Sequence, residues 1–340
     1  MINKTHNKDS LIDNLAAEVN KMPFASEEDK KSVMERLLSA KNRKINILIT
    51  GSTGCGKSST INALFDTQNA KVGMGSDPET MSIKKYEEKN LILWDSPGFG
   101  DGIKEDEQHA KGIIKLLHEV DKNNAPLIDV VLVIIDGSSR DYGTTYRLLE
   151  QVIIPSLGRD ESKRILVAIN QADVAMKGRH WDVENNKPEP ILVEFLQEKV
   201  KSTQQRIKES TGVNIEPIFY SAGYQDESGK QLPYNLSKLL YFIVQHVPSN
   251  KRYIIPDNMN KSAGIYKQSD EQKKYIEETK LSFAESLLEV MGDVTDGIAN
   301  AVEAVSDVVN TAIDIGKDIV SSVGSGLRSA GQFIGRLFGF

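Results

Sequence analysis

Short apolar runs alternate with amphipathic stretches along the middle of this sequence. The runs are four to six residues long and mostly rich in β-branched residues: 45–50, 91–94, 130–135, 165–170 and 215–220. Runs of this length, separated by helical stretches, predict strands of a mainly parallel sheet that is buried on both faces. The sequence therefore predicts an α/β fold, and a helix over 235–246 would close it.

The pattern becomes helical on both sides of this region. Residues 8–44 predict two polar helices that are broken at 22–24, with Ser26 at the start of the second helix. Prolines at 248 and 256 predict a linker over 249–268. We therefore expect an N-terminal helical segment (1–44), a central domain (45–248), the linker, and a C-terminal amphipathic helical segment (269–340).

Residues 51–58 read GSTGCGKS and fit the pattern G-x-x-x-x-G-K-[ST] of a phosphate-binding loop. The motif follows a predicted strand and opens a predicted helix, which is the context this loop requires. Its glycines let main-chain N–H groups point at phosphates, Lys57 should reach the β- and γ-phosphates, and Ser58 should bind Mg²⁺. The expected nucleotide contacts here are Gly51, Thr53, Gly54, Cys55, Gly56, Lys57, Ser58 and Ser59.

A second motif, DSPG, begins at Asp95, directly after the run 91–94 and 38 residues after Lys57. An aspartate at a strand end can hold Mg²⁺, usually through water, and the N–H of Gly98 can sense a γ-phosphate. A threonine between the two motifs can ligate Mg²⁺ while a triphosphate is bound and release it after hydrolysis. On chemistry alone the candidate hydroxyl groups are those of Ser76, Thr80 and Ser82.

A third motif, NQAD, ends the run 165–170 and is similar to the Asn-Lys-x-Asp motif by which GTPases read guanine. Asp173 would accept hydrogen bonds from guanine N1 and N2, which adenine cannot supply, so adenine would be disfavoured by roughly 2–5 kcal/mol. Gln171 replaces the usual lysine and can still stack on the base, but without the positive charge. The further base-side residues are Asn170 and, in the last loop, Ser221, Ala222 and Gly223, a main-chain N–H of which would face guanine O6.

Phe99 follows DSPG at the place where Ras-like proteins carry a glutamine that orients the attacking water. Phenylalanine cannot orient water, so hydrolysis would depend on main-chain groups, on a water near the switch threonine, or on a partner chain. Asp101, Arg140 and Asp141 are the polar candidates nearby. Slow turnover of the isolated monomer is the expected consequence.

Composition narrows the class of partner. The formal net charge of the 340 residues is -6, so we expect no DNA as a partner. The one cysteine excludes an internal disulfide framework, and residues 1–10 lack the apolar stretch of a secretory signal. The sequence contains no run of 18 apolar residues and therefore predicts no membrane span, so we expect a cytoplasmic protein.

Five sequence elements make up the candidate site: the loop 51–58, a hydroxyl residue within 76–82, DSPG, NQAD and the loop 221–223. Their order and spacing resemble those of the Era-like (TRAFAC) P-loop GTPases over residues 44–246. The stretches GSTGCGKSSTINALF and LILWDSPGFGDG, with GRHW shortly after NQAD, look like the YeeP/YfjP-type bacterial branch. The resemblance implies a Ras-like P-loop GTPase fold that binds GTP or GDP with Mg²⁺. It also makes Thr80 the switch threonine, so the implied metal ligands are Ser58, Thr80 and Asp95, and the implied catalytic groups are Lys57, Thr80 and Gly98.

The C-terminal segment leaves two interpretations open. Apolar residues recur at helical spacing from Ile298 to Val323, with acidic residues largely on the other side. Residues 270–320 would pack back on the N-terminal helices as a small helical domain. For residues 321–340, where glycines are spaced by four among phenylalanines and two arginines, we favour a peripheral contact with the inner face of the membrane or a contact between copies.

The first function hypothesis is a GTPase that hydrolyses GTP to GDP and phosphate as a conformational switch. Its helical ends would contact a membrane or a second copy, as a homodimer or oligomer, and GTP would release the C-terminal tail. The alternatives are a GTP sensor that does not hydrolyse its ligand, which Phe99 permits, and a ribosome-associated GTPase.

Overall fold

The computed structural model describes residues 10–22, 24, 26–65, 83–100, 102–158, 161–224, 231–262, 264–292 and 298–313. The chain forms two compact units. The sheet unit comprises residues 45–248 and 258–276, and the helical unit comprises residues 1–44, 249–257 and 277–340.

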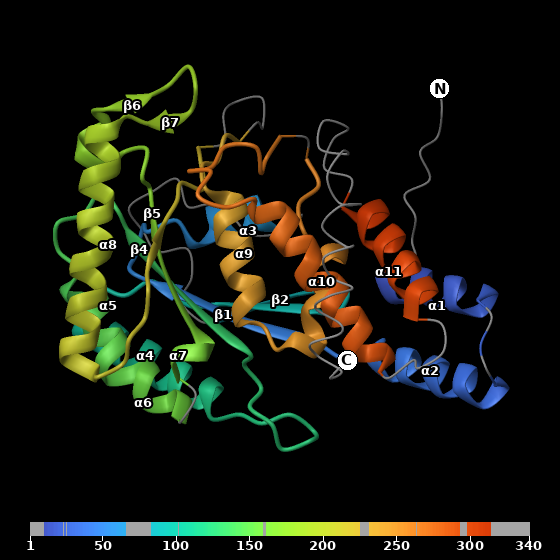
Figure 1. Ribbon diagram of the computed structural model, residues 1–340. Coiled ribbons are helices and arrows are strands. Elements are labelled where there is room, and N and C mark those ends of the chain that lie inside the picture. The colour runs from blue at the N-terminus through green and yellow to red at the C-terminus, as the bar shows by residue number, and fades with distance from the viewer. Residues whose placement is uncertain are drawn as a thin grey trace, which may run out of the picture. The chain divides into compact units, whose positions relative to one another are not determined.

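A six-stranded sheet forms the centre of the sheet unit (Figure 1), with the strand order β2-β3-β1-β4-β5-β8. The strands are β1 (Ile45–Gly51), β2 (Lys84–Glu88), β3 (Leu91–Asp95), β4 (Val130–Asp136), β5 (Ile165–Asn170) and β8 (Ile218–Phe219). Every neighbouring pair is parallel except β2 and β3. The predicted α/β class with a mainly parallel sheet is confirmed.

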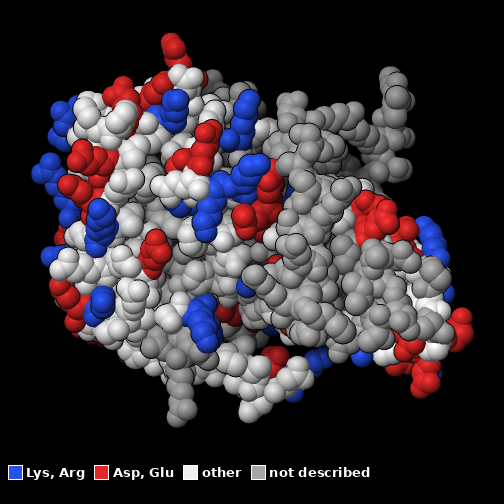
Figure 2. Space-filling view, in the orientation of Figure 1, with Lys and Arg blue, Asp and Glu red and all other residues white. Residues whose placement is uncertain are grey.

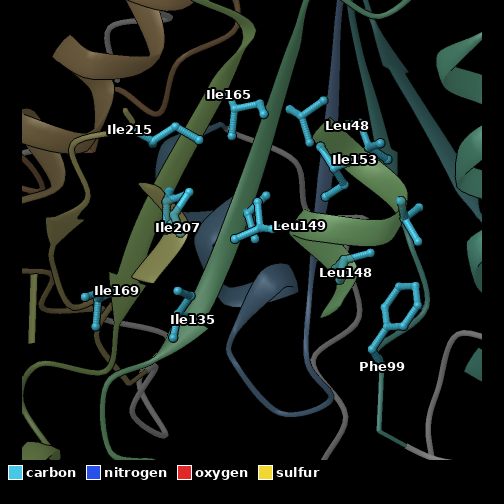
Figure 3. Packing of buried hydrophobic residues seen from close by; sticks show 14 of the residues in the cluster. Leu48, Phe99, Ile135, Leu148, Leu149, Ile153, Ile165, Ile169, Ile207 and Ile215 are labelled. Carbon is cyan, nitrogen blue, oxygen red and sulfur yellow. The ribbon is translucent and has the colours of Figure 1, made fainter. Parts of the chain in front are cut away.

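Helices cover both faces of this sheet. One face carries α4 (Ile103–Leu117), α5 (Gly143–Leu148), η1 (Leu149–Ile153), α6 (Ile154–Leu157) and α8 (Pro190–Thr211), and the other carries α3 (Lys57–Leu64) and α9 (Leu236–His246). Leu149 and Ile153 belong to one buried cluster with the strand residues Ile135 and Ile169 in the first of these layers (Figure 3). Because both faces are covered, the central strands are apolar at nearly every position.

The strands of the sheet unit depart from the sequence prediction at three places. Strand β2 was not predicted, because its sequence, KKYEE, is polar and it lies at an edge of the sheet. Strand β8 is shorter than the apolar run 215–220, and Pro217, which has no N–H to donate, precedes it. A small hairpin of β6 (Trp181–Asp182) and β7 (Lys187–Pro188) also went unpredicted. The remaining short elements of the unit are α7 (Glu161–Arg164) and η3 (Ala175–Gly178).

The helical unit contains α1 (Leu11–Lys21), α2 (Glu27–Ala40), η4 (Ser249–Asp257), most of α10 (Tyr275–Met291) and α11 (Ile298–Ala312). Helix α2 begins after Ser26, whose hydroxyl accepts the N–H of Asp29 at 3.0 Å, as a helix cap does. Helix α11 packs against α1 and buries Val305 and Val309. Residues 298–313 thus pack on an N-terminal helix, as the sequence predicts for residues 270–320. Residues 321–340 lie outside the described part of the chain.

Residues 249–257, where the sequence predicts a linker, belong to the helical unit. The Asp257 carboxylate accepts the N–H of Leu11 at 3.0 and 3.1 Å and so caps the start of α1. The Tyr253 hydroxyl donates to the carbonyl of Ala40 at 2.6 Å, and its side chain is buried. Contacts with residues more than 200 positions away therefore fold this interval, and such contacts leave no local signal in the sequence.

Charges of both signs are interspersed over the described residues on the face shown in Figure 2. Lysines and arginines lie among aspartates and glutamates, without a continuous band of one sign. No described helix is both long enough and apolar enough to cross a bilayer.

Candidate nucleotide-binding site

The glycine-rich loop 51–56 connects β1 to α3, as its motif requires. Gly56 precedes the helix with φ 91°, and a side chain there would overlap the amide of Asn170. Helix α3 then begins at Lys57, so the main-chain N–H groups of its first turn lack helical acceptors and are available to an anion. The sequence-predicted phosphate loop has the expected position at the carboxyl end of β1.

Lys57 lies across this loop. Its Nζ donates to the carbonyl of Ser52 at 3.1 Å and to that of Gly51 at 3.4 Å. Both acceptors are neutral main-chain groups, so these bonds hold the ammonium over the loop without neutralising its charge. A phosphate oxygen would offer this ammonium a stronger, charge-assisted hydrogen bond.

The DSPG segment follows β3 and lies beside the phosphate loop. The N–H of Phe99 donates to the carbonyl of Gly51 at 3.2 Å, and the N–H of Thr53 donates to the carbonyl of Phe99 at 3.0 Å. A side chain at position 98 would overlap Thr53, so only glycine fits there. The predicted γ-phosphate sensor, Gly98, is therefore in direct contact with the loop it would act with.

Asp95 has the features of a residue that holds a cation. Its side chain is 2% exposed, and Oδ1 has no hydrogen-bond partner among the described residues. Burial raises the pKa of Asp95 to about 6, against the opposing influence of Lys57 and Lys84. A buried carboxylate oxygen without a partner fits a Mg²⁺ ion or a water bound to it, and Ser58, at the start of α3, would supply a second oxygen.

The raised pKa predicts that Mg²⁺ binding depends on pH. Because a proton and the cation compete for the Asp95 carboxylate, affinity should be constant above pH 7 and fall as pH drops through about 6. A Mg²⁺ titration of the nucleotide-loaded protein between pH 5 and 8, followed by fluorescence, measures this fall. The nucleotide phosphates also titrate here, so the matched control is Asp95→Asn, whose profile should be flatter. Identical profiles for the two proteins would contradict the assignment.

Phe99 does not take the place of a water-orienting side chain. Its ring is 5% exposed within the hydrophobic core and makes an edge contact with His109 of α4, with ring centroids 6.0 Å apart. Arg140 and Asp141 lie on the exposed loop after β4, where the Asp141 carboxylate accepts the N–H of Gly143 at 2.8 Å. The Asp141 carboxylate therefore stabilises the turn in which it lies.

Asn170 joins the base-side motifs to the phosphate loop. Its Nδ2 donates to the carbonyl of Cys55 at 2.9 Å, and its Oδ1 accepts the N–H of Ala222 at 2.9 Å. Gln171 makes a parallel link, because its Nε2 donates to the carbonyl of Gly54 at 2.8 Å. The loop 51–56, residues 170–171 and the loop 221–223 therefore meet at the carboxyl ends of the parallel strands. The side-chain amide of Gln171 supplies an N–H donor at the position where GTPases usually carry lysine.

Asp173 contacts the last base-side loop directly. The hydroxyl of Ser221 donates to Asp173 Oδ1 at 2.6 Å, which fixes one carboxylate oxygen and leaves Oδ2 for another donor. The N–H groups of the loop are already engaged: Ser221 donates to Tyr234, Ala222 to Asn170 and Gly223 to the Ser221 hydroxyl. The N–H expected to face guanine O6 would therefore be shared with one of these acceptors.

Two residues that hold this loop were missed from the sequence. The Nε2 of Gln231 donates to the carbonyl of Ala222 at 2.6 Å, with longer bonds of 3.3 Å to the carbonyls of Ser59 and Gly223. The fully buried Tyr220 hydroxyl lies 2.6 Å from the hydroxyl of Thr60, which itself donates to the carbonyl of Gly56 at 2.8 Å. No local motif marks either residue, because Gln231 lies 172 positions from Ser59 and Tyr220 lies 160 positions from Thr60.

Replacing Tyr220 by phenylalanine is expected to lower the free energy of unfolding by about 1 kcal/mol, because one buried hydrogen bond is lost while Thr60 keeps its acceptor. Urea unfolding of the full chain measures the change. The matched control is Tyr224→Phe, at a side chain that is 80% exposed, which should stay within about 0.5 kcal/mol of the parent. Equal effects at both tyrosines would contradict the buried link.

Of the remaining predicted residues, four lie outside the described part of the chain and one, Cys55, lies within it. Ser76, Thr80, Ser82 and Asp101 lie outside the described residues. Cys55 is fully buried, and burial raises the pKa of its thiol, as expected of a packed side chain.

Residues 46–171 match the family model described as 50S ribosome-binding GTPase. This interval runs from β1 to Gln171 and includes the phosphate loop, Asp95 and Asn170, so this part of the chain is similar to P-loop GTPases. Asp173 and the loop 221–223 lie beyond it. No curated protein matches the sequence.

Solved structures of GTP-binding proteins align with the chain at low identity. Toc33 from Arabidopsis thaliana, in complex with GDP and Mg²⁺, is 16% identical over 64% of this chain and 87% of its own, with a TM-score of 0.40. A probable GTP-binding protein engB is 23% identical over 59% of this chain and 97% of its own, with a TM-score of 0.35. The bacterial dynamin GTPase LeoA from ETEC is 14% identical over 88% of this chain and 46% of its own, with a TM-score of 0.38.

Proposed function

We propose that the sheet unit binds a guanine nucleotide with Mg²⁺ and hydrolyses GTP to GDP and phosphate as a conformational switch. The observation that carries the proposal is the junction at Asn170, which bonds the phosphate loop on one side and the loop 221–223 on the other. A site that binds one nucleotide needs its phosphate-binding and base-binding groups side by side, and this junction supplies that arrangement.

Each part of the nucleotide would have its own contacts. Lys57 and the first N–H groups of α3 would bind the phosphates. Asp173, oriented by the Ser221 hydroxyl, would select guanine. Ser58, Thr80 and Asp95 would hold Mg²⁺, which when bound would neutralise negative charge on the phosphates.

Hydrolysis would be slow in the monomer, because the Phe99 ring is buried in the core and offers nothing to a water molecule. We propose that a second copy completes the site, with the exposed Arg140 as the candidate side chain, since arginine stabilises the charge that develops on a transferred phosphoryl group. We also propose the YeeP/YfjP-type branch as the finer relationship, on the stretches GSTGCGKSSTINALF and LILWDSPGFGDG.

The test is phosphate release from GTP by the full chain, measured over a hundredfold range of protein concentration. A rate per molecule that rises with concentration is expected, and Arg140→Ala should remove the rise while GDP binding stays unchanged. A low rate that is independent of concentration would contradict activation by a second copy. GTP binding without any release, at any concentration, would favour the non-hydrolysing sensor.

Membrane contact is a separate proposal that depends on residues 321–340. Liposome co-sedimentation with and without a non-hydrolysable GTP analogue tests it, with more lipid-bound protein expected in the presence of the analogue. Equal sedimentation of the full chain and of a chain that ends at residue 320 would rule out a lipid-binding tail.

A further inference from the structure

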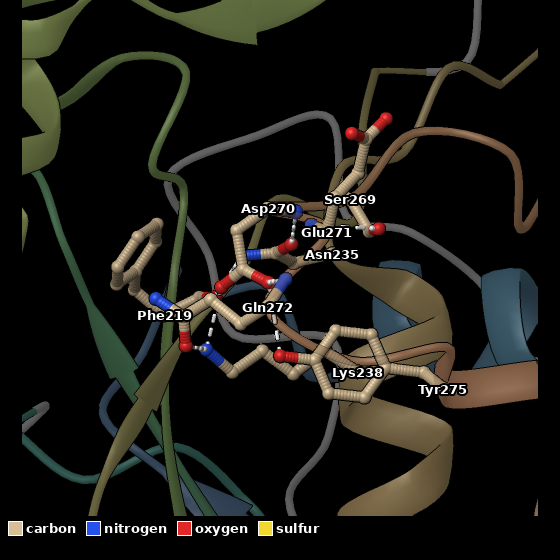
Figure 4. Close-up of polar contacts among 8 residues, drawn as sticks. All are labelled: Phe219, Asn235, Lys238, Ser269, Asp270, Glu271, Gln272 and Tyr275. Atoms are coloured by element: carbon tan, nitrogen blue, oxygen red, sulfur yellow. Dashed lines mark hydrogen bonds and ion pairs between the residues drawn. The ribbon is translucent and has the colours of Figure 1, made fainter. Parts of the chain in front are cut away.

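A buried polar cluster connects α9 to the segment 270–275 (Figure 4). Lys238 of α9 and Asp270 form an ion pair at 2.6 Å, and each side chain is only 10% exposed. The hydroxyl of Tyr275 donates to the other oxygen of Asp270 at 2.9 Å, and Lys238 Nζ also lies 3.4 Å from Gln272 Oε1. The sequence places Asp270 and Tyr275 beyond the expected end of the nucleotide-binding domain at residue 248.

Asn235 connects this cluster to the sheet. Its Oδ1 accepts the N–H of Asp270 at 2.7 Å, and its Nδ2 donates to the carbonyl of Phe219, at the end of β8, at 3.1 Å. The N–H of Asn235 donates to the carbonyl of Gln268 at 2.9 Å. Asn235 has φ 57°, a left-handed conformation that costs energy in most residues and that these bonds stabilise.

The neighbouring residue carries the connection to the base-reading carboxylate. Tyr234 exchanges two main-chain hydrogen bonds with Ser221, at 3.0 and 2.9 Å. The hydroxyl of Ser221 in turn donates to Asp173 at 2.6 Å. A continuous series of short contacts therefore runs from Asp270 through Asn235, Tyr234 and Ser221 to Asp173.

We propose that Lys238 and Asp270 are positioning residues for guanine recognition, which act through Asn235 and Tyr234 on the loop 221–223. The inference rests on the proposed function, because it concerns the base-binding half of the same site. It assigns to the segment 268–275 a role in nucleotide affinity.

A purely structural role would give a different result. Breaking a buried ion pair leaves an unpaired charge and destabilises the fold as a whole, whereas removing both charges leaves none. The double variant Lys238→Met with Asp270→Leu should therefore regain the stability that Asp270→Asn loses. It should not regain base recognition, because the Tyr275 hydroxyl and Asn235 Nδ2, which lie 2.9 and 3.5 Å from the two carboxylate oxygens of Asp270, would still lack these acceptors.

The experiment compares the full chain with Asp270→Asn and with the double variant in equilibrium binding of GDP, ADP and inorganic tripolyphosphate, alongside thermal unfolding. We expect both variants to bind GDP about tenfold more weakly, with a smaller preference for GDP over ADP and unchanged tripolyphosphate binding. The control is Lys85→Met, which removes a charge from the Lys85–Glu87 pair on β2 and should change none of these quantities.

Four outcomes are decisive. The expected pattern in the double variant alone supports the inference even if Asp270→Asn does not fold. A GDP affinity within twofold of the parent in the double variant overturns it. Parallel loss of GDP and tripolyphosphate binding also overturns it, because that pattern indicates general unfolding of the site. A parent chain without preference for GDP over ADP instead contradicts the proposed function.

Discussion

Replacing Asp173 by asparagine is expected to change the preferred base from guanine to xanthine. Guanine presents N–H donors at N1 and N2, which suit a carboxylate, whereas xanthine presents a carbonyl at C2, which suits an amide N–H₂. In the structure Asp173 Oδ1 already accepts the Ser221 hydroxyl. An asparagine can keep that bond with its oxygen and turn its Nδ2 toward the base.

Competition binding with GDP and xanthosine diphosphate measures this change. The loss of GDP affinity should correspond to roughly 2–5 kcal/mol, because guanine donors would face an amide N–H₂. The matched control is Asp182→Asn, in the hairpin strand β6, which should leave both affinities unchanged. Unaltered GDP preference in Asp173→Asn would show that another residue reads the base.

Replacing Lys57 by alanine should remove most of the phosphate binding and nearly all GTP hydrolysis. The Lys57 ammonium is held over the loop by two neutral carbonyls, so its charge is available to the β- and γ-phosphates. We expect a fall of at least about 100-fold in phosphate release, the usual scale for removing one group that stabilises transition-state charge.

Lys85→Ala is the control for this prediction, because it removes a lysine of the same unit whose charge is paired with Glu87 on β2. Its rate of phosphate release should match that of the parent. Hydrolysis by Lys57→Ala within threefold of the parent would show that the loop 51–58 is not the phosphate site.

The sheet and the position of the glycine-rich loop 51–56 between β1 and α3 could be predicted because their signals are local. The runs that became β4 and β5 are nearly unbroken and only Asn46 interrupts the apolar start of β1, while the glycines, Lys57 and Ser58 lie within eight consecutive residues. The edge strand β2 escaped because polar residues such as Lys85 and Glu87 are typical of a solvent-exposed edge and equally typical of a loop. An element could therefore be predicted from the sequence where one short segment contained all the residues that identify it.

The supporting contacts of the site could not be predicted. No sequence motif includes Gln231, Lys238 or Asp270. Their contacts are with residues that only the folded chain brings near them. The same is true of Asp257, which accepts the N–H of Leu11 at the start of α1 although the two lie 246 positions apart. Such contacts are decided by tertiary structure, which a single sequence does not display.

Calorimetric titration of the full chain with GDP and with ADP, in Mg²⁺ at pH 7.5, tests the central claim most directly. The Asn170 junction, with Asp173 beside it, predicts tight binding of GDP and binding of ADP that is weaker by at least about 30-fold, because adenine would leave Asp173 Oδ2 without a donor. Equal affinities for the two nucleotides, or no heat from either, would contradict the account.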